Sequence, residues 1–534
     1  MSDPAELNSL LERHMAERPQ ATALVDGERR WSFADFDGLC ARTAAWLAEQ
    51  GIGPGDRVAV WLVNRVEWLA LLFALARRGA AMMSVNTRFR EAELAHVLER
   101  SQARLLVIQR RFRRIDFDTI LDAIDGARFT RLERVAVLDA GAARPSHVLG
   151  KPAVAFDADA LPAADDQAAH LASPEAPLIF FTTSGTTSGP KLVVHVQRNL
   201  ALHARNVARA LGFEGAGHGT LGAVPFCGTF GLTAALASLA AGVPVVPMQA
   251  FDAGDAAALV RRHALTHMFG TDDMLRHMLE LDEAAAAMPT LKLAGFVLNE
   301  DLAQRALARG WPVAGLYGSS EVQALFSLQP PQLPLAERLL GGGLPCGAQA
   351  EVRARDVESG ELLPPGATGE LEIRSPTRFV GYLDNPEATA KVIRPDGFFR
   401  TGDIGRVRGD GSFVFETRTG DAIRLGGFLV SPVEIEAVIR QLPGVAEVQI
   451  VGVELQGQRR AAAFVVRRGG GDAAPTEAAV IEWVKARMAA FKVPARVWFV
   501  ESYPVTHSAN GDKIQRGKLR EMAIERLAAE GGAA

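Results

Sequence analysis

An apolar run gives way to hydroxyl-bearing residues and glycines, and then ends on a proline and a lysine, at Phe180-Phe181-Thr182-Thr183-Ser184-Gly185-Thr186-Thr187-Ser188-Gly189-Pro190-Lys191. Residues 176–181 are apolar enough for a buried strand, whereas the residues that follow are too small and flexible to pack, so we expect a loop there. Glycines let a backbone approach an anion closely, amides and hydroxyls donate hydrogen bonds, and Lys191 supplies positive charge. The stretch therefore favours a strand followed by a loop that binds a polyphosphate.

The spacing of this loop differs from that of a Walker A motif, in which the lysine follows a glycine and precedes a serine or threonine. Here Pro190 precedes Lys191 and Leu192 follows it. On composition alone, a plain surface turn explains the stretch equally well. The rest of the chain has to decide between the two interpretations.

The composition is that of a large globular protein. At 534 residues the chain is long enough for two or more domains, and its 48% hydrophobic and 22% charged residues are ordinary for such proteins. The net charge of −4 gives no general attraction to nucleic acid, and no apolar stretch reaches transmembrane length. The first residues lack the basic flank and apolar core of an export signal, and the three cysteines lack metal-ligand spacing. We therefore expect a cytoplasmic protein without nucleic-acid or integral membrane contacts.

The order of the apolar segments predicts an α/β fold. Helical and strand patterns alternate between residues 7 and 108, and a second alternation runs from residue 224 to 298. Such alternation is typical of α/β layers with a largely parallel sheet. The alanine- and aspartate-rich stretch 110–172 has weak periodicity, so we expect a loosely structured connection there.

The last third of the chain predicts two further parts. From Gly347 onward, short β runs are separated by turn residues, which indicates a small β-subdomain over about 347–419. Helical and strand patterns then alternate after Gly420. We therefore predict a large N-terminal domain of α/β layers that includes the β-subdomain, residues 1–419, and a small mobile α+β C-terminal domain, residues 420–534.

Two charged residues stand out by their local sequence. Glu321 ends a strand pattern and a small-residue turn, Gly315-Leu316-Tyr317-Gly318-Ser319-Ser320-Glu321. A carboxylate at the carboxyl end of a strand in an α/β sheet is well placed to bind a ligand or a metal. Lys513 lies in the glycine-containing turn Asn510-Gly511-Asp512-Lys513. Taken singly, each is described better as a solvated surface residue.

Five segments, taken together and in order, resemble the adenylate-forming superfamily, which contains acyl- and aryl-CoA synthetases, the adenylation domains of peptide synthetases and beetle luciferases. The likeness extends over nearly the whole chain, and it replaces the surface interpretations given above. The segments are residues 183–191, Tyr317-Gly318-Ser319-Ser320-Glu321, Thr401-Gly402-Asp403, Arg418 with Asp421, and Gly511-Asp512-Lys513-Ile514-Gln515-Arg516.

The resemblance implies a ligase that uses ATP, Mg²⁺ and CoA. In the first step a substrate carboxylate attacks the α-phosphorus of ATP, which forms an acyl-adenylate and releases pyrophosphate. In the second step a thiol attacks the acyl carbon and AMP leaves. Adenylation is needed because the negative charge of a carboxylate repels nucleophiles, and it also installs a good leaving group.

The resemblance also implies which residues bind the phosphates. Glu321 would bind Mg²⁺, Ser320 would bond a phosphate, and Lys513 would donate to the α-phosphate and the substrate carboxylate. A cation at that place lowers the repulsion between two anions as they meet. The β- and γ-phosphates would be held by Thr183, Ser184, Gly185, Thr186, Thr187 and Lys191.

The nucleoside would be bound by residues of two other segments. By the same resemblance, Tyr317 and Gly318 would flank adenine, and Asp403 would accept the ribose hydroxyls with help from Arg418. In this family the terminal domain rotates between the two steps, withdrawing the lysine and bringing another face to the thiol tunnel. Gly426 and Gly427 match that face.

One departure from the family pattern concerns the hinge of this rotation. The hinge position usually carries Asp or Lys, and here it is Gly420. Glycine has the broadest φ/ψ range, so it can absorb a large backbone change, although it gives up the hydrogen bonds of an Asp or Lys side chain.

The acid is expected to be apolar, either a fatty or an aryl acid. By the same resemblance, no basic residue of the acyl pocket marks a second carboxylate, and the pocket would be lined by Phe226, Gly228, Phe230, Phe296 and Val322. An aromatic residue or a histidine commonly occupies the place of Gly228 in the family, so the pocket is expected to differ in shape.

Three alternatives stay open at this stage. A stand-alone enzyme of this type could load the phosphopantetheine of a separate carrier protein, although free CoA is the simpler thiol because no carrier segment follows Lys513 in this sequence. A catalytically silent nucleotide-binding protein is less favoured, because a pure binder has no chemical use for Lys513. Luciferase-like oxidation would share the adenylation step. The expected partners are small molecules, and the expected state is a monomer or a homodimer.

Overall fold

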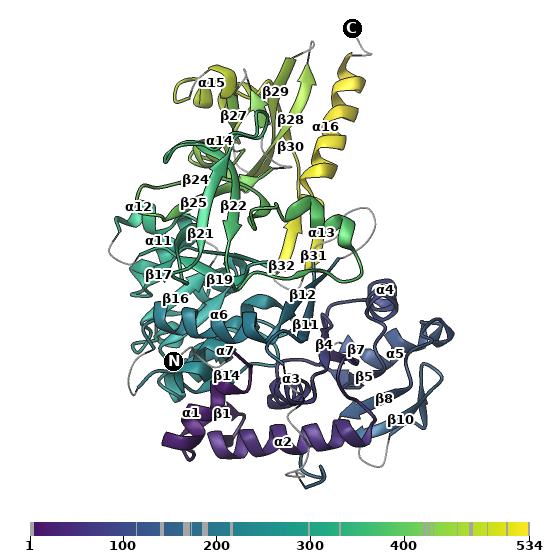
Figure 1. Ribbon diagram of the computed structural model, residues 1–534. Coiled ribbons are helices and arrows are strands. Elements are labelled where there is room, and N and C mark those ends of the chain that lie inside the picture. Colours follow the sequence, from purple (N-terminus) through teal and green to yellow (C-terminus); the bar gives the residue numbers. More distant parts are fainter. Residues whose placement is uncertain are drawn as a thin grey trace. The chain divides into compact units, whose positions relative to one another are not determined.

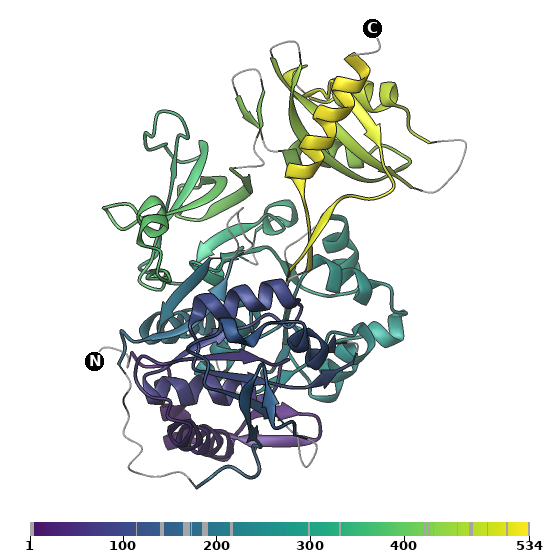
Figure 2. The ribbon, with the colours of Figure 1, turned by 90° about the vertical axis from the view of Figure 1, so that its right-hand side faces the viewer.

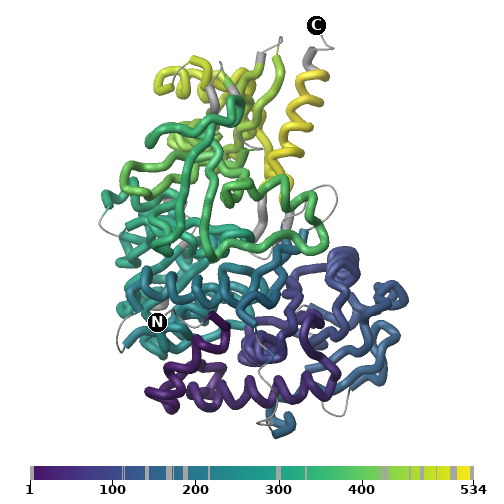
Figure 3. Tube along the Cα trace, in the orientation of Figure 1, coloured from purple at the N-terminus to yellow at the C-terminus, as the bar shows by residue number. Residues whose placement is uncertain are grey.

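The computed structural model describes residues 5–113, 115–138, 144–163, 171, 173–183, 191–213, 217–296, 300–330, 333–419, 423–425, 428–430, 432–455, 458–468, 474–488, 490–508 and 511–531 (Figure 3). Several predicted site residues lie outside this part, namely Ser184, Gly185, Thr186, Thr187, Gly420, Gly426 and Gly427. For Phe296 and Lys513 the backbone is described, but the side chain is not.

The chain forms two compact units. The first contains Met1–Glu351 and Arg374–Gly397, and the second contains Val352–Ile373 and Phe398–Ala534. The predicted fold class, mixed α/β with a large N-terminal and a smaller C-terminal part, is confirmed. The predicted boundary at residues 419 and 420 stays a prediction, because Gly420 lies outside the described residues.

A nine-stranded sheet occupies the first unit, with the order β23-β12-β11-β4-β3-β5-β8-β10-β9. Its central strands pair in parallel, whereas β12 pairs antiparallel with both β11 and β23. The strands are β3 (Arg57–Trp61), β4 (Ala81–Ser84), β5 (Leu105–Ile108), β8 (Arg134–Leu138), β9 (His147–Val148), β10 (Lys151–Phe156), β11 (Pro177–Thr182), β12 (Leu192–Val196) and β23 (Gly381–Tyr382).

The expectation of a loose connection over residues 110–172 is wrong. Strand β8 lies inside the sheet between β5 and β10, and β10 continues it. Residues 135–138 are all buried and apolar, which is the pattern of a strand covered on both faces. The same stretch also holds the short pair β6 (Arg111–Phe112) and β7 (Ile115–Asp116) and the helix α5 (Phe117–Asp122).

A second, seven-stranded sheet in this unit has the order β17-β16-β15-β13-β14-β1-β2. It is parallel except for the hairpin of β1 with β2. The strands are β1 (Thr22–Asp26), β2 (Arg29–Ser32), β13 (Thr220–Gly222), β14 (Val245–Pro247), β15 (His267–Gly270), β16 (Leu293–Phe296) and β17 (Val313–Ala314).

Helices of the first unit pack in pairs and against these sheets. Helix α3 contacts α2, β4 and β11, and α6 contacts α7 and β12 (Figure 1). Every residue from Trp68 to Ala76 of α3 is buried, so this helix is covered on all sides. The helices are α1 (Ser9–Glu17), α2 (Phe33–Glu49), α3 (Val66–Arg78), α4 (Glu91–Ser101), α6 (Gln197–Ala210), α7 (Thr229–Ala241), α8 (Ala253–Arg262), α9 (Asp272–Leu279), α10 (Glu283–Ala286), α11 (Glu300–Ala308), α12 (Leu335–Arg338) and α13 (Pro386–Val392).

Antiparallel strands follow these sheets in sequence. In the first unit, β18 (Leu316–Ser319) pairs with β19 (Gln323–Leu328), and β19 pairs with β20 (Gly342–Pro345). In the second unit, four short strands lie in the order β25-β24-β22-β21. They are β21 (Glu351–Arg355), β22 (Thr368–Arg374), β24 (Phe399–Val407) and β25 (Phe413–Arg418).

The C-terminal part of the second unit is built around a three-stranded sheet, β28-β29-β30. Helix α14 packs on one face with Ile435 and Ile439, and α16 packs with Leu519 and Ala523 against Phe464 and its neighbours (Figure 2). In the described residues no helix is long and apolar enough to span a bilayer. The elements are β26 (Ile423–Leu425), β27 (Phe428–Val430), α14 (Pro432–Arg440), β28 (Val445–Leu455), β29 (Gln458–Arg467), α15 (Glu477–Lys485), β30 (Arg496–Phe499), β31 (Val505–Ser508), β32 (Gly511–Ile514) and α16 (Arg516–Gly531).

Candidate active site

The predicted phosphate loop joins two neighbouring antiparallel strands. Strands β11 and β12 are paired up to Thr182 and Leu192. The amide of Thr183 then donates to the carbonyl oxygen of Lys191 at 3.0 Å, and the amide of Lys191 donates to Thr183 Oγ1 at 3.3 Å. These bonds close the base of the loop and hold its first and last residues in register.

The turn that carries Glu321 connects β18 to β19. Ser319 Oγ accepts hydrogen bonds from the amides of Glu321, at 3.2 Å, and Val322, at 3.4 Å, and the amide of Phe379 donates to the carbonyl oxygen of Glu321 at 2.7 Å. The backbone packs tightly here, because a Cβ atom on Gly318 would lie 2.5 Å from the Cα atom of Ala324. The sequence therefore places Glu321 in a turn whose shape is tightly determined.

Two buried histidines support this turn and the strand after it. Nε2 of His195, on β12, donates to the carbonyl oxygen of Ser320 at 2.7 Å, and Nε2 of His203, on α6, donates to that of Ala324 at 2.8 Å. Burial lowers the pKa of both imidazoles to about 4, so both rings are neutral near pH 7. Sequence reasoning missed both residues, although a histidine inside the apolar run Leu192-Val193-Val194-His195-Val196 is a signal of a buried polar contact.

Tyr382 connects two of the predicted ligand-binding side chains. It lies on β23 opposite Val193 of β12, and its hydroxyl donates to Glu321 Oε1 at 3.0 Å. The Lys191 ammonium lies over the Tyr382 ring, 4.8 Å from its centroid. Burial and the neighbouring Glu321 raise the pKa of the phenol well above its usual range, so it stays protonated. Tyr382 is one of only three tyrosines in the chain, and nothing in its local sequence linked it to Glu321.

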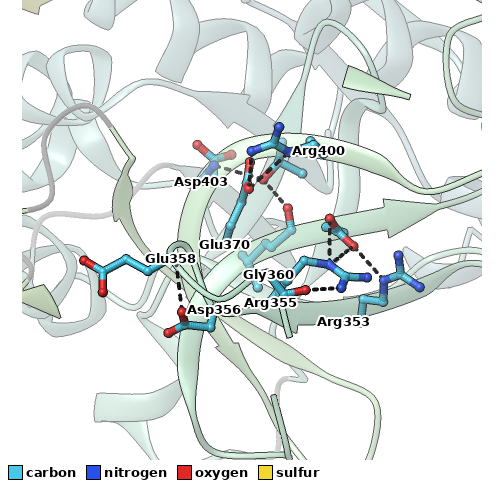
Figure 4. A network of polar contacts seen from close by, with 11 residues as sticks. Arg353, Arg355, Asp356, Glu358, Gly360, Glu370, Arg400 and Asp403 are labelled. Carbon is cyan, nitrogen blue, oxygen red and sulfur yellow. Dashed lines mark hydrogen bonds and ion pairs between the residues drawn. The ribbon is translucent and has the colours of Figure 1, made fainter. Parts of the chain in front are cut away.

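The second unit brings Asp403 and Arg418 together. They are cross-strand partners on β24 and β25, and Arg418 Nε lies 2.9 Å from Asp403 Oδ1. The Asp403 side chain is 2% exposed and that of Arg418 is 55% exposed, so the pair is open on the arginine side only. The amide of Asp403 donates to Thr401 Oγ1 at 2.9 Å, and Figure 4 shows Asp403 with the nearby ion pair of Arg400 and Glu370, 2.8 Å apart.

Lys513 lies on β32, where its backbone is paired with Thr506 of β31. Its strand ends in two anchoring contacts. The amide of Gln515 donates to the carbonyl oxygen of Pro504 at 2.8 Å, and Arg516 Nη2 lies 2.9 Å from Oε1 of the buried Glu436. Glu436 Oε1 also accepts a hydrogen bond from the amide of Ile450 at 2.8 Å.

Comparison with known proteins now decides the family. The model of the AMP-binding enzyme family matches residues 11–383, and the model of its C-terminal domain matches residues 434–510. The chain belongs to the AMP-binding enzyme family. This membership confirms the sequence-based assignment to the adenylate-forming superfamily and to its AMP-forming acid–thiol ligases.

Alignments with named relatives cover nearly the whole length of this AMP-binding enzyme. It is 32% identical to a 2-succinylbenzoate–CoA ligase of Geobacillus kaustophilus, over 94% of this chain and 95% of that one. It is also 32% identical to a fatty acid–[acyl-carrier-protein] ligase of Streptomyces coeruleorubidus, over 95% and 94% of the two chains. The ATP-bound crystal structure of MatB from Rhodopseudomonas palustris matches with a TM-score of 0.78 and 26% identity, over 97% of this chain and 99% of that one.

Glu321 is a suitable Mg²⁺ ligand in this AMP-binding enzyme. Among the described residues its carboxylate makes no ion pair, and one neutral hydroxyl donates to it. No group of three or more His, Cys, Asp or Glu residues that could hold a metal occurs in the described part of the chain. Mg²⁺ is commonly bound through one or two carboxylates together with substrate phosphates, so a single carboxylate beside a phosphate loop fits this ion.

The residues predicted to line the acyl pocket lie mostly in the interior of the first unit. Phe226 and Val322 are fully buried, and Phe230 is packed near Phe269 with ring centroids 6.2 Å apart. Gly228 caps the N-terminus of α7, and the side chain of Phe296 lies outside the described residues. Their role as pocket residues of this AMP-binding enzyme stays a prediction, as does the adenine contact of Tyr317 and Gly318.

Proposed function

We propose that this protein is an ATP-dependent carboxylate–CoA ligase that activates an apolar fatty or aryl acid. The observation that carries the proposal is the arrangement of Lys191, Ser320 and Glu321. The two ends of the phosphate loop are held in register, and Tyr382 links its lysine to the carboxylate of the neighbouring turn. A cation, a hydroxyl and a carboxylate that makes no ion pair among the described residues suit a magnesium–nucleotide polyphosphate.

The proposed reaction has two steps. An oxygen of the substrate carboxylate forms a bond to the α-phosphorus of ATP, and the bond from that phosphorus to the pyrophosphate oxygen breaks. The sulfur of CoA then forms a bond to the acyl carbon, the bond from that carbon to the AMP oxygen breaks, and the thiol proton passes to solvent. Mg²⁺, when bound, supplies positive charge that neutralises phosphate oxygens.

Each residue has a proposed task in these steps. Lys191 and the loop residues Thr183, Ser184, Gly185, Thr186 and Thr187 stabilise charge on the departing pyrophosphate, and Ser320 bonds a phosphate oxygen. Asp403 accepts the ribose hydroxyls, and the exposed guanidinium of Arg418 assists it. Lys513 brings a positive charge to the α-phosphate and the attacking carboxylate, which reduces the repulsion between the two anions.

For the second step, Lys513 has to leave the site so that the thiol can reach the acyl carbon. We propose that a domain of residues 420–534 rotates about Gly420, so that Gly426 and Gly427 face the thiol channel. The support is the presence of Lys513 on β32, in the C-terminal part of the second unit, and a glycine at the hinge position.

The proposed acid is apolar because the residues predicted to surround it, Phe226, Phe230 and Val322, are buried and uncharged. The relative named for fatty acids supports an apolar acid, whereas 2-succinylbenzoate has an aromatic ring but two carboxylates, so that relative supports an aryl acid without supporting an apolar one. A carrier-protein thiol is the second candidate acceptor, favoured by the 32% identity to a fatty acid–[acyl-carrier-protein] ligase.

The test is pyrophosphate release with ATP, Mg²⁺ and a panel of fatty, aryl, amino and dicarboxylic acids, with hydroxylamine to trap acyl-AMP. CoA or a holo-carrier protein is then added to each active acid. We expect activity with one apolar class, a rise with CoA, and loss in Lys513→Ala. ATP binding without pyrophosphate release for any acid would overturn the ligase proposal, and transfer to the carrier alone would replace CoA as the acceptor.

A further inference from the structure

We propose that Tyr382 is a positioning residue that holds Glu321 ready for Mg²⁺ and Lys191 ready for the nucleotide phosphates. The inference rests on the proposed function, because it assumes that these two side chains bind magnesium and ATP. Tyr382 comes from a segment distant in sequence from both of them, on the edge strand β23.

Tyr382 orients the carboxylate of Glu321. The phenol donates to Oε1 at 3.0 Å, which fixes the carboxylate without supplying a positive charge. A lysine or arginine in that place would neutralise the carboxylate and compete with a metal ion. Because the phenol is a neutral donor, the negative charge of Glu321 stays available to a divalent cation.

Tyr382 also holds the ammonium of Lys191. Its ammonium lies 4.8 Å from the centroid of the Tyr382 ring, within the range of a cation–π interaction. The ring attracts the ammonium through its quadrupole and carries no net charge. Lys191 is therefore held near the loop while its charge stays available to a phosphate, which an ion pair with a carboxylate would prevent.

Tyr382 is itself held in place by its backbone contacts and by burial. Its amide donates to Thr389 Oγ1 at 2.9 Å, its strand pairs with β12, and its side chain is nearly buried. The same segment contacts the Glu321 turn a second time, through the amide of Phe379 and the carbonyl oxygen of Glu321 at 2.7 Å. One segment thus holds the glutamate by its backbone and by its side chain.

The two contacts of Tyr382 can be separated by two substitutions. Tyr382→Phe removes the hydroxyl and keeps the ring, whereas Tyr382→Leu removes both. Tyr503→Phe is the matched control, because Tyr503 is also a largely buried tyrosine and its hydroxyl donates to the carbonyl oxygen of Phe464 in the second unit, at 3.3 Å. Glu321→Gln provides the reference for a lost metal ligand.

The measurement is the equilibrium affinity for ATP, without any acid, in the presence of Mg²⁺ and again in EDTA. We expect Tyr382→Phe to lose about tenfold of the affinity in Mg²⁺ and to keep the affinity in EDTA, since the hydrogen bond lost is one to a charged group. Tyr382→Leu is expected to weaken ATP binding in EDTA as well. Tyr503→Phe is expected to match the wild type in both conditions.

The outcomes distinguish this proposal from the one on which it rests. If Tyr382→Phe keeps the full gain in affinity on adding Mg²⁺ while Glu321→Gln loses it, the positioning role is wrong and the proposed function stands. If Glu321→Gln also keeps that gain, Glu321 is not the metal ligand and both assignments fail. Equal losses in Mg²⁺ and EDTA for Tyr382→Phe, together with a lower melting temperature, would indicate a structural role only and would also overturn the proposal.

Discussion

Two glutamates of this chain are held in contrasting ways. Glu436, in the second unit, is 3% exposed, lies 2.9 Å from Arg516 Nη2 and accepts a backbone hydrogen bond at 2.8 Å. Glu321, in the first unit, is partly exposed, accepts a hydrogen bond from a phenol and makes no ion pair among the described residues. The charge of Glu436 is therefore matched within the fold, whereas the charge of Glu321 is left for something else to match.

This difference separates a structural contact from a binding site. A buried carboxylate with an arginine partner is fixed, and removing either partner leaves an uncompensated charge. A carboxylate oriented by neutral donors keeps its charge for a ligand. The ion pair of Glu436 with Arg516 is called the closed pair. Arg516 follows Lys513 by three residues and begins α16, so the closed pair anchors the strand that carries the predicted catalytic lysine.

The largest expected effect is on stability, and it comes from breaking the closed pair. Glu436→Gln should lower the free energy of unfolding of the second unit by about 3–5 kcal/mol, because it leaves Arg516 largely buried without a matching charge. Urea unfolding followed by the fluorescence of Trp483 and Trp498 measures this loss. Glu321→Gln should change stability far less, since its carboxylate has no cationic partner among the residues that the structure describes.

A matched control lies in the same unit. Glu482 pairs with Lys485 at 3.0 Å, but both side chains are more than half exposed, so Glu482→Gln should cost less than about 1 kcal/mol. Replacing both members of the closed pair by methionine should recover much of the lost stability. Equal losses for Glu436→Gln and Glu482→Gln would contradict the claim that burial makes the Glu436 ion pair matter more for stability than an exposed one. Equal losses for Glu436→Gln and Glu321→Gln would contradict the contrast between the two glutamates.

The next largest effect is expected at Lys513, the residue whose strand is anchored by the ion pair of Glu436 with Arg516. Lys513→Ala should slow adenylation by about 10²–10³-fold, as expected when one preorganised donor to developing charge is removed, and should leave thioester formation from supplied acyl-AMP intact. Single-turnover assays of the two half-reactions measure this split. Lys518→Ala, on an exposed position of α16, is the control and should affect neither step. Loss of both half-reactions in Lys513→Ala would argue against a role confined to the first step.

The sequence could name candidate site residues, because ligand-binding loops are often formed by contiguous residues, and the roles of these residues stay predictions. The motifs named Lys191, Glu321, Asp403 and Arg418, and the structure shows that the last two are cross-strand partners. The comparisons confirmed the family and the fold class that these motifs implied.

The partners that hold these residues could not be predicted. Tyr382 is 61 residues from Glu321, and Arg516 is 80 residues from Glu436. Such pairs depend on which helices, strands and turns become neighbours in the fold, and local sequence patterns do not contain that information. The strand β8 was missed for a related reason, since the alanine- and aspartate-rich segments around it weakened the periodicity of the whole stretch.

A smaller effect is expected at the predicted hinge. Rotation there would replace Lys513 by Gly426 and Gly427 at the reaction centre. Gly420→Pro should slow thioester formation by about tenfold and adenylation by less, because proline fixes φ and restricts the backbone change. Rapid-quench measurement of each half-reaction tests this, with Gly420→Ala as the milder control. Equal slowing of both half-reactions would refute a hinge role.

The smallest effect concerns the support of the Glu321 turn and its dependence on pH. His195 and His203 have a folded-state pKa of about 4, against about 6.5 in an unfolded chain. A base whose pKa is lowered by folding contributes full stability above pH 6.5 and loses that contribution as the pH falls toward 4, because the unfolded chain takes up the proton. Between pH 7 and pH 6 the loss should be under about 1 kcal/mol for each histidine, and at most about 1.4 kcal/mol for each further pH unit.

Other histidines with lowered pKa values, such as His267, add to the same slope, so single variants are needed to isolate each contribution. His195→Gln removes one titrating group while an amide can still donate toward the Ser320 carbonyl oxygen, and it should flatten the dependence of unfolding free energy on pH below 6.5. If His195→Gln kept the wild-type slope, the ring would not be held neutral beneath the Glu321 turn. The acid sensitivity of this region would then have to come from its other buried groups.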